Sequence, residues 1–131
     1  MSTERVARFV RNATIDVSYT VKEKAAFHRE GRFVLKALAD ALGLAPGTYE
    51  IRSNKGGIAV SGEVTLHGER VYVQLSQPYV RHDGHDFFWR ACNGRQDYSG
   101  RRNHWSRWSE LNDLPALSVR INAFVAADLG D

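Results

Sequence analysis

The sequence predicts an α+β fold, in which a four- to five-stranded antiparallel sheet has a helix before it and a helix after it. Two helical stripes and one stretch of alternation carry this prediction. Apolar residues recur at helical spacing in residues 22–43 and 113–129, whereas apolar and polar residues alternate through residues 47–92. The length of 131 residues, without repeats or proline-rich linkers, indicates a single domain over residues 1–131.

An arm or an edge strand is expected at residues 1–21. Residues 14–21 alternate, with apolar side chains at Ile15, Val17, Tyr19 and Val21. A period of two over such a short segment is typical of a half-buried strand. The sequence therefore predicts that this segment joins the edge of the sheet.

The first helix is expected at residues 22–43. Leu35, Leu38 and Leu42 form its apolar stripe, and Gly43 provides a stop signal. Gly31 lies inside this segment, where glycine lowers helical propensity. A second helix at residues 113–129 has Pro115 in its first turn, where the missing N–H is tolerated.

The antiparallel strands are expected within residues 47–92, and the alternation is clearest in residues 58–67. One face carries Ile58, Val60, Val64 and Leu66, and the other carries Ser61, Glu63 and Thr65. We expect the apolar set to pack against the leucines of the first helix, with Glu63 facing away. Gly68 and Glu69 fit a two-residue hairpin turn, and a long loop over residues 93–109 follows the last strand.

Residues 87–108, here named the basic aromatic segment, carry the net positive charge of the protein. The segment holds five arginines against one acid, Asp97, whereas the other 109 residues hold 13 basic and 14 acidic side chains. It also contains all three tryptophans. Guanidinium groups grip phosphates and aromatic faces accept unstacked bases, so the pattern points to nucleic acid. The candidate binding residues are Trp89, Arg90, Arg95, Tyr98, Arg101, Arg102, His104, Trp105, Arg107 and Trp108.

Two other interpretations of this segment stay open. In the first, the tryptophans anchor the loop on the core and the arginines are merely solvated. A long unstructured loop is uncommon unless it is functional, which favours a contact role. Tryptophan and arginine are also enriched at the energetic centres of protein interfaces. The partner is therefore nucleic acid, or a host protein or nucleoprotein complex.

Three further groups of residues suggest chemistry. Glu63, His67 and Arg90 are expected on one polar face, where a base, an acid and a phosphate clamp would suffice for metal-independent RNA cleavage. Cross-strand ion pairing is the simpler interpretation. The run HDGHD at residues 82–86 offers metal-ligand types, but a polar turn explains it as well, so no metal and no cofactor are expected. Cys92 ends an apolar strand and is interpreted as a packed small side chain.

Three tracts of the sequence resemble a protein family, and this resemblance suggests where the gene is found. The tracts GTYEIRSNKGGIAVSGEVTLHG (residues 47–68), VYVQLSQ (71–77) and RACNGRQDYSGRRNHW (90–105) resemble a family of small proteins from bacteriophages, plasmids and integrated elements that has no established activity. The resemblance covers roughly residues 30–105. Arg101 stands where the family has a glycine. The resemblance implies an accessory gene of a mobile element, with DNA maintenance or suppression of host defence as the usual roles.

The cysteine count and the lengths of the apolar runs indicate the cellular compartment. A single cysteine excludes an intrachain disulfide and favours a reducing compartment. No apolar run approaches the ~18 residues that span a bilayer, and no signal peptide is visible, so we expect a cytoplasmic protein in a bacterial host, without a membrane partner.

The leading functional prediction is a non-enzymatic accessory protein of a mobile element that binds nucleic acid through the basic aromatic segment. The alternatives are an anti-defence inhibitor that binds a host protein, and a small ribonuclease. The order of a helix, three strands and a helix is also that of double-stranded RNA-binding domains. This protein departs from that order by its extra strand and its long loop.

Overall fold

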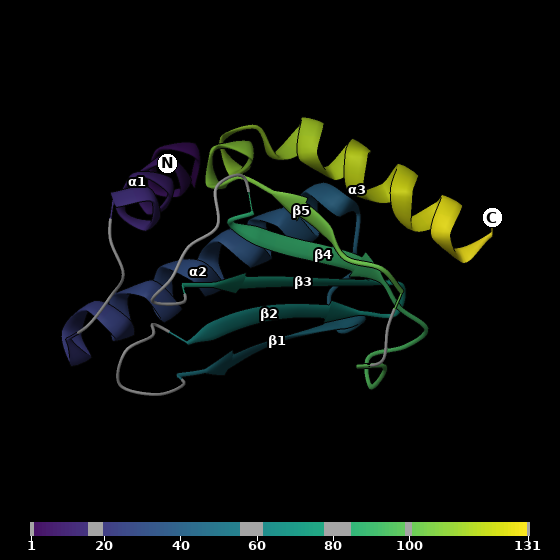
Figure 1. The fold of residues 1–131 in the computed structure, drawn as a ribbon, viewed down its shortest axis with the longest axis horizontal. Helices are drawn as coiled ribbons and strands as arrows, with labels where there is room; N and C mark the ends of the chain where they lie inside the picture. The colour runs from purple at the N-terminus through teal and green to yellow at the C-terminus, as the bar shows by residue number, and fades with distance from the viewer. Residues whose placement is uncertain (1, 16–19, 56–61, 78–84, 99–100, 131) are drawn as a thin grey trace.

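The computed structural model describes residues 2–15, 20–55, 62–77, 85–98 and 101–130 (Figure 1). Within them the predicted α+β class is confirmed, with three α-helices, a five-stranded antiparallel sheet and a short 3-10 helix. The elements are α1 Ser2–Ile15, α2 Val21–Leu42, β1 Tyr49–Asn54, β2 Glu63–Gly68, β3 Val71–Ser76, β4 Phe87–Ala91, β5 His104–Ser106, η1 Trp108–Asn112 and α3 Leu114–Leu129.

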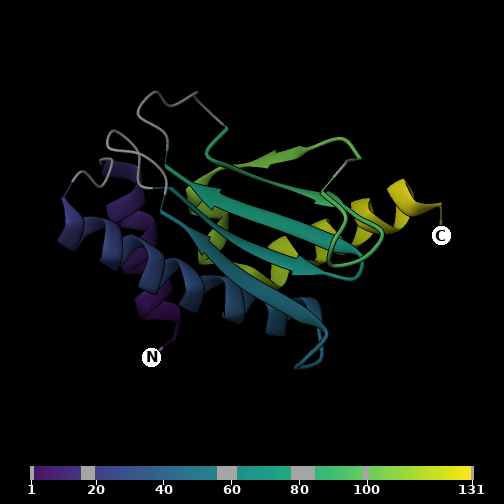
Figure 2. The ribbon, with the colours of Figure 1, turned by 90° about the horizontal axis from the view of Figure 1, so that it is seen from below.

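The sheet is a simple meander. Its strands lie in the order β1-β2-β3-β4-β5, and each neighbouring pair is antiparallel. Figure 2 shows the helices on one side of the sheet. We name the opposite side the outer face. Because side chains alternate along a strand, each strand sends one set of residues into the helical layer and the other set to the outer face.

The core lies between the sheet and the helices. Leu66, Val73 and Trp89 form one row of register partners across the central strands and are fully buried. They belong to the same hydrophobic core as the helix α2 residues Leu35, Leu38 and Leu42. These are the leucines that the sequence predicts to face the sheet.

The predicted orientation of β2 is confirmed where the structure describes it. Val64 and Leu66 are buried in the core, and Glu63 lies on the opposite face together with Thr65. Ile58, Val60 and Ser61, which belong to the same prediction, lie outside the described residues.

Helix α2 occupies the segment predicted as the first helix. It begins with a capping box, in which the Glu23 N–H donates to Thr20 Oγ1 at 3.0 Å and the Glu23 carboxylate accepts from the Thr20 N–H at 3.1 Å. It ends at Gly43, whose φ of +82° suits glycine. Helix α2 continues through Gly31 and lies close to β2 there, since a Cβ at Gly31 would lie 3.2 Å from Val64 Cγ2.

The edge strand expected at residues 14–21 is wrong. Thr14 lies in the last turn of helix α1 instead, with its hydroxyl donating to the Val10 carbonyl at 2.7 Å, and Val21 is the first residue of α2. One face of helix α1 is buried, and its apolar residues recur at helical spacing: Val6, Phe9, Val10 and Ala13. This helical pattern extends over more residues than the alternation that predicted a strand. Residues 16–19 lie outside the described part of the chain.

Two smaller expectations also need correction. The hairpin between β2 and β3 turns at Glu69 and Arg70, one residue later than predicted, because Gly68 still pairs with Tyr49 of β1. The loop expected at residues 93–109 contains β5 and the start of η1. Strand β5 has three residues, too few to display an alternation, and it forms through pairing with β4.

Filling the space at Gly31 should separate α2 from β2. Gly31→Leu is expected to lower the free energy of unfolding by about 1–3 kcal/mol, because an overpacked core forces backbone shifts. Adding Val64→Ala should recover part of this loss by making room for the new side chain. Urea denaturation of the two variants measures both effects, and an unchanged stability of Gly31→Leu would contradict the close approach.

Glu30 links α1 to α2 and makes stability depend on acid pH. Arg5 Nη2 and Arg29 Nε each donate to Glu30 Oε2 at 3.0 Å. The bond from Arg5 is the main reason that the pKa of Glu30 falls from 4.5 to about 2. A carboxyl whose pKa is lower in the folded state stabilises the fold above its unfolded pKa, and this contribution is lost as protons bind.

Glu30→Gln should therefore flatten the part of the stability profile between about pH 4.5 and pH 2. Arg5→Met should remove most of the same pH dependence, because it deletes the main donor. The measurement is a series of urea titrations across this range. A parent protein whose stability stays constant from pH 5 to about pH 2 would refute this assignment.

Candidate functional site

The basic aromatic segment is divided between the two faces of the sheet. In β4, Phe87, Trp89 and Ala91 are buried on the helical side, whereas Phe88 and Arg90 lie on the outer face. Register with β4 places Trp105 of β5 on the outer face as the partner of Phe88. The ten predicted binding residues therefore do not form one surface.

Trp89 and Trp108 are core residues, as the anchor interpretation proposes. Trp89 is 0% exposed and its Nε1–H donates to Ser106 Oγ at 3.0 Å. Trp108 is 2% exposed, stacks on Phe87 and meets the edge of Phe9. Neither ring is available to a ligand.

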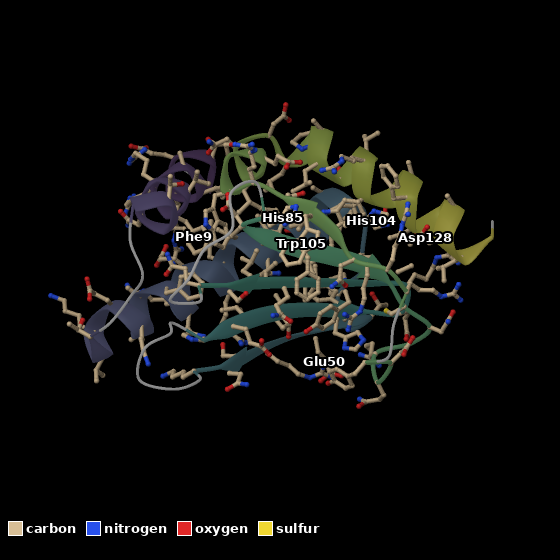
Figure 3. The ribbon with its side chains drawn as sticks, viewed as in Figure 1. Phe9, Glu50, His85, His104, Trp105 and Asp128 are labelled. Atoms are coloured by element: carbon tan, nitrogen blue, oxygen red, sulfur yellow. The ribbon has the colours of Figure 1, made fainter. Side chains whose placement is uncertain are left out.

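His104 and Arg101 tie the end of α3 to the sheet. The His104 ring stacks on Trp89, with centroids 4.7 Å apart, and its Nε2 lies 2.7 Å from Asp128 Oδ2 (Figure 3). Arg101 donates to the backbone carbonyl of Asp128 at 2.9 Å. Both predicted binding residues thus have partners within the fold.

The outer face carries a chain of aromatic rings. We name it the outer ladder, and its successive centroids lie between 5.0 and 6.1 Å apart. The terminal rings His85 and Tyr98 are exposed, Tyr98 by 55%, and Trp105, which is next to His85, is 40% exposed, so the ladder meets solvent at both ends. Figure 3 shows Trp105 beside His85, on which it stacks. The ladder comprises His85, Trp105, Phe88, Tyr72, His67 and Tyr98.

Arg90 lies across the middle of the outer ladder. Its guanidinium carbon is 4.5 Å from the Tyr72 ring centroid and 5.7 Å from that of Phe88. It also donates to the Tyr98 carbonyl at 3.1 Å and to Asn103 Oδ1 at 3.3 Å. A cation over ring faces is stabilising. Arg90 therefore supports the ladder and holds the connection between β4 and β5.

His67 is a neutral, buried member of the ladder. Its Nδ1 lies 3.2 Å from Arg52 Nη1, and because arginine is always a donor, Nδ1 accepts. Burial, followed by the charge of Arg52, lowers the pKa of His67. Burial also raises the pKa of Tyr72 to about 12. The centre of the ladder thus stays uncharged near neutral pH.

The residues of the catalytic alternative share the outer face but do not form an open site. Glu63 and His67 lie on one side of β2, and Arg90 is on the same side of β4. His67 is 0% exposed, because its ring packs edge-on against Tyr72 and Tyr98. A substrate would have to displace Tyr98 before His67 donated a proton to it.

The remaining predicted arginines are Arg95, Arg102 and Arg107. Arg95 donates to the Gly47 carbonyl at 3.1 Å, whereas Arg102 and Arg107 are exposed. The fold also brings α1 beside η1 through the Phe9–Trp108 contact. Helix α1 carries Arg8 and Arg11 at exposed positions, so these arginines lie in an element that neighbours the basic aromatic segment.

The HDGHD run is described only in part. His82, Asp83 and Gly84 lie outside the described residues. His85 stacks on Trp105, and Asp86 Oδ2 accepts from the Trp108 N–H at 2.8 Å. Among the residues that the structure describes, no group of three or more histidines, cysteines or acids is placed to hold a metal ion.

Cys92 is a packed residue. Its Sγ lies 3.4 Å from the Gly68 carbonyl oxygen, and burial raises the pKa of the thiol. A raised thiol pKa disfavours the reactive thiolate.

Comparisons with protein families, with curated proteins and with solved structures found no match. None of the helices in the described part of the chain has the length and apolar composition needed to cross a bilayer. Sequence reasoning missed Tyr72, Phe88, His85 and Arg52 as members of this site. The alternation in residues 71–77 already placed Tyr72 opposite the core, and this was the available signal.

Replacing a buried tryptophan should destabilise the protein more than replacing the exposed one. Trp89→Ala is expected to lower the free energy of unfolding by about 3–5 kcal/mol, as is usual for a buried tryptophan. Trp105→Ala should lower it by about 1 kcal/mol or less, since its ring is partly exposed. Urea denaturation compares them, and equal losses would contradict the division of the segment between two faces.

Proposed function

We propose that this protein binds single-stranded nucleic acid on the outer face of its sheet, with the outer ladder as the stacking surface. The observation that carries the proposal is the exposed ring of Trp105, which lies in a continuous row of aromatic side chains beside Arg90. Bases have two π faces and stack on such rings in any sequence context. A single strand offers unstacked bases, whereas a duplex buries them.

Each part of the site has a role in this proposal. Trp105 and Tyr98, two exposed rings near opposite ends of the ladder, accept bases, and Arg90 holds the rings between them. Gln74 lies on the same face, where its Oε1 accepts from the Tyr72 hydroxyl at 2.9 Å and its amide donors can meet a base edge. Arg102 and Arg107, exposed near β5, supply phosphate contacts.

The proposed setting is a bacterial mobile element, and the tracts described in the sequence analysis support it. The protein would be an accessory factor that holds single strands without cleaving them. Catalysis is not part of the proposal, because His67 is buried. A protein partner would use the same exposed aromatic and arginine side chains, so the experiment has to distinguish the two kinds of partner.

The test is a fluorescence anisotropy titration with labelled single-stranded DNA and RNA at several salt concentrations. Trp105→Ala should weaken binding by ~1–3 kcal/mol with little change in the salt dependence, because it removes a stacking surface. Arg102→Ala with Arg107→Ala should lower the logarithmic salt slope by up to about 1.4, since each lost phosphate contact on a single strand removes up to about 0.7.

Lys22→Ala with Lys36→Ala is the charge-matched control, because both lysines are exposed on α2, on the helical side. This control should leave affinity nearly unchanged. Circular dichroism must show that every variant is folded. The proposal fails if the folded parent has no affinity at low salt. A lysate partner that survives nuclease and is lost with Trp105→Ala would then identify a protein ligand.

A further inference from the structure

Strand β1 forms one border of the sheet that the structure describes. Among the described strands it pairs only with β2, along all six of its residues. Figure 1 shows β1 at the lower border of the sheet, with no helix alongside its outer edge. The other border strand, β5, has three residues and lies next to α3, whose Arg120 Nη2 donates to the Trp105 carbonyl at 3.5 Å. An edge strand presents a row of backbone donors and acceptors to another strand.

The side chains of β1 differ between its two faces. Tyr49 and Ile51 pack against the core on the helical side and are partly buried. Glu50 and Arg52 lie on the outer face, where Arg52 Nη2 is 3.0 Å from Glu50 Oε2. The centre of this edge therefore consists of an apolar residue flanked by one acid and one base.

This order of charges is complementary to itself. When two β1 strands pair antiparallel with Ile51 opposite Ile51, each Glu50 lies opposite the Arg52 of the second copy. Opposite charges directly across a strand pair are stabilising. The same register places Tyr49 opposite Ser53, so the two largest side chains of the edge do not collide.

Neighbouring registers lack this match. A slip of one residue turns one copy over, so that the outer face of one sheet meets the helical face of the other. The registers centred on Glu50 or Arg52 keep the outer faces together but place two acids or two bases opposite each other. Like charges in this position are destabilising. The Ile51-centred register is thus favoured among these pairings.

We propose that two copies of this chain dimerise through β1, antiparallel and centred on Ile51. The two five-stranded sheets then form one continuous sheet. The two outer faces lie side by side in it, and the helices of both copies lie behind. A strand from another protein would also find an open edge, but it need not carry acid and base in this order, whereas a second copy always does.

Charge reversal tests the pairing. Analytical ultracentrifugation of the full chain should show a monomer–dimer equilibrium. Glu50→Arg should weaken the dimer by roughly tenfold or more, because two attractive pairs become repulsive. Glu50→Arg combined with Arg52→Glu should restore it. Glu4→Arg, the same charge change at an exposed position on α1, should have no effect.

Cross-linking tests the register independently of these charges. Directly opposed Cα atoms in an antiparallel pair are about 4.5–5.5 Å apart, which suits a disulfide. Ile51→Cys should therefore give a covalent dimer on mild oxidation. Ser53→Cys should not, since the two substituted positions would lie ~14 Å apart. The unsubstituted chain, in which Cys92 is buried, gives the background level of cross-linking.

These outcomes decide the proposal. It is supported if the Ile51→Cys cross-link forms and the Glu50→Arg chain dissociates. It is overturned by a chain that remains monomeric at high concentration, by a dimer insensitive to Glu50→Arg, or by cross-linking of Ser53→Cys in preference to Ile51→Cys. The cross-link remains informative even if the double reversal does not fold.

Discussion

The burial of Trp89 organises the rest of the structure. Its ring is fully buried, its Nε1–H bonds to Ser106, and its faces meet His104 and the guanidinium of Arg120. This one side chain therefore joins β4, β5 and α3. Because strand residues alternate, an inward Trp89 also requires that its neighbours Phe88 and Arg90 point outward. The exposed surface is in this sense a consequence of the core.

Local periodicity predicted the elements whose signals are long, and it failed where the decisive contacts are distant. The leucine stripe of α2 and the alternation of β2 were sufficient to predict which residues are buried. The three residues of β5 show no period of their own, because β4 defines the strand. The burial of two tryptophans was likewise not readable from composition, since a ring can serve the core or a ligand equally well.

The arginines of the basic aromatic segment illustrate a related point. Arg90, Arg95 and Arg101 each donate to a backbone carbonyl, of Tyr98, Gly47 and Asp128 respectively. Tyr98 and Gly47 lie in irregular backbone and Asp128 lies in the last turn of α3, and at such places backbone carbonyls lack partners within a helix or sheet. The charges are still present and still contribute to the local potential. The number of arginines in a segment therefore overstates the number of side chains that reach a ligand.

The meander has a consequence for how the chain folds. Every strand pairs with its neighbour in sequence, so the sheet assembles by closing short loops, which is entropically inexpensive. The contact between Phe9 and Trp108 is different, because it joins positions 99 residues apart. Contacts of such large sequence separation slow folding when they are needed early. The amino-terminal helix is therefore the element best suited to dock last, onto a sheet that has already formed.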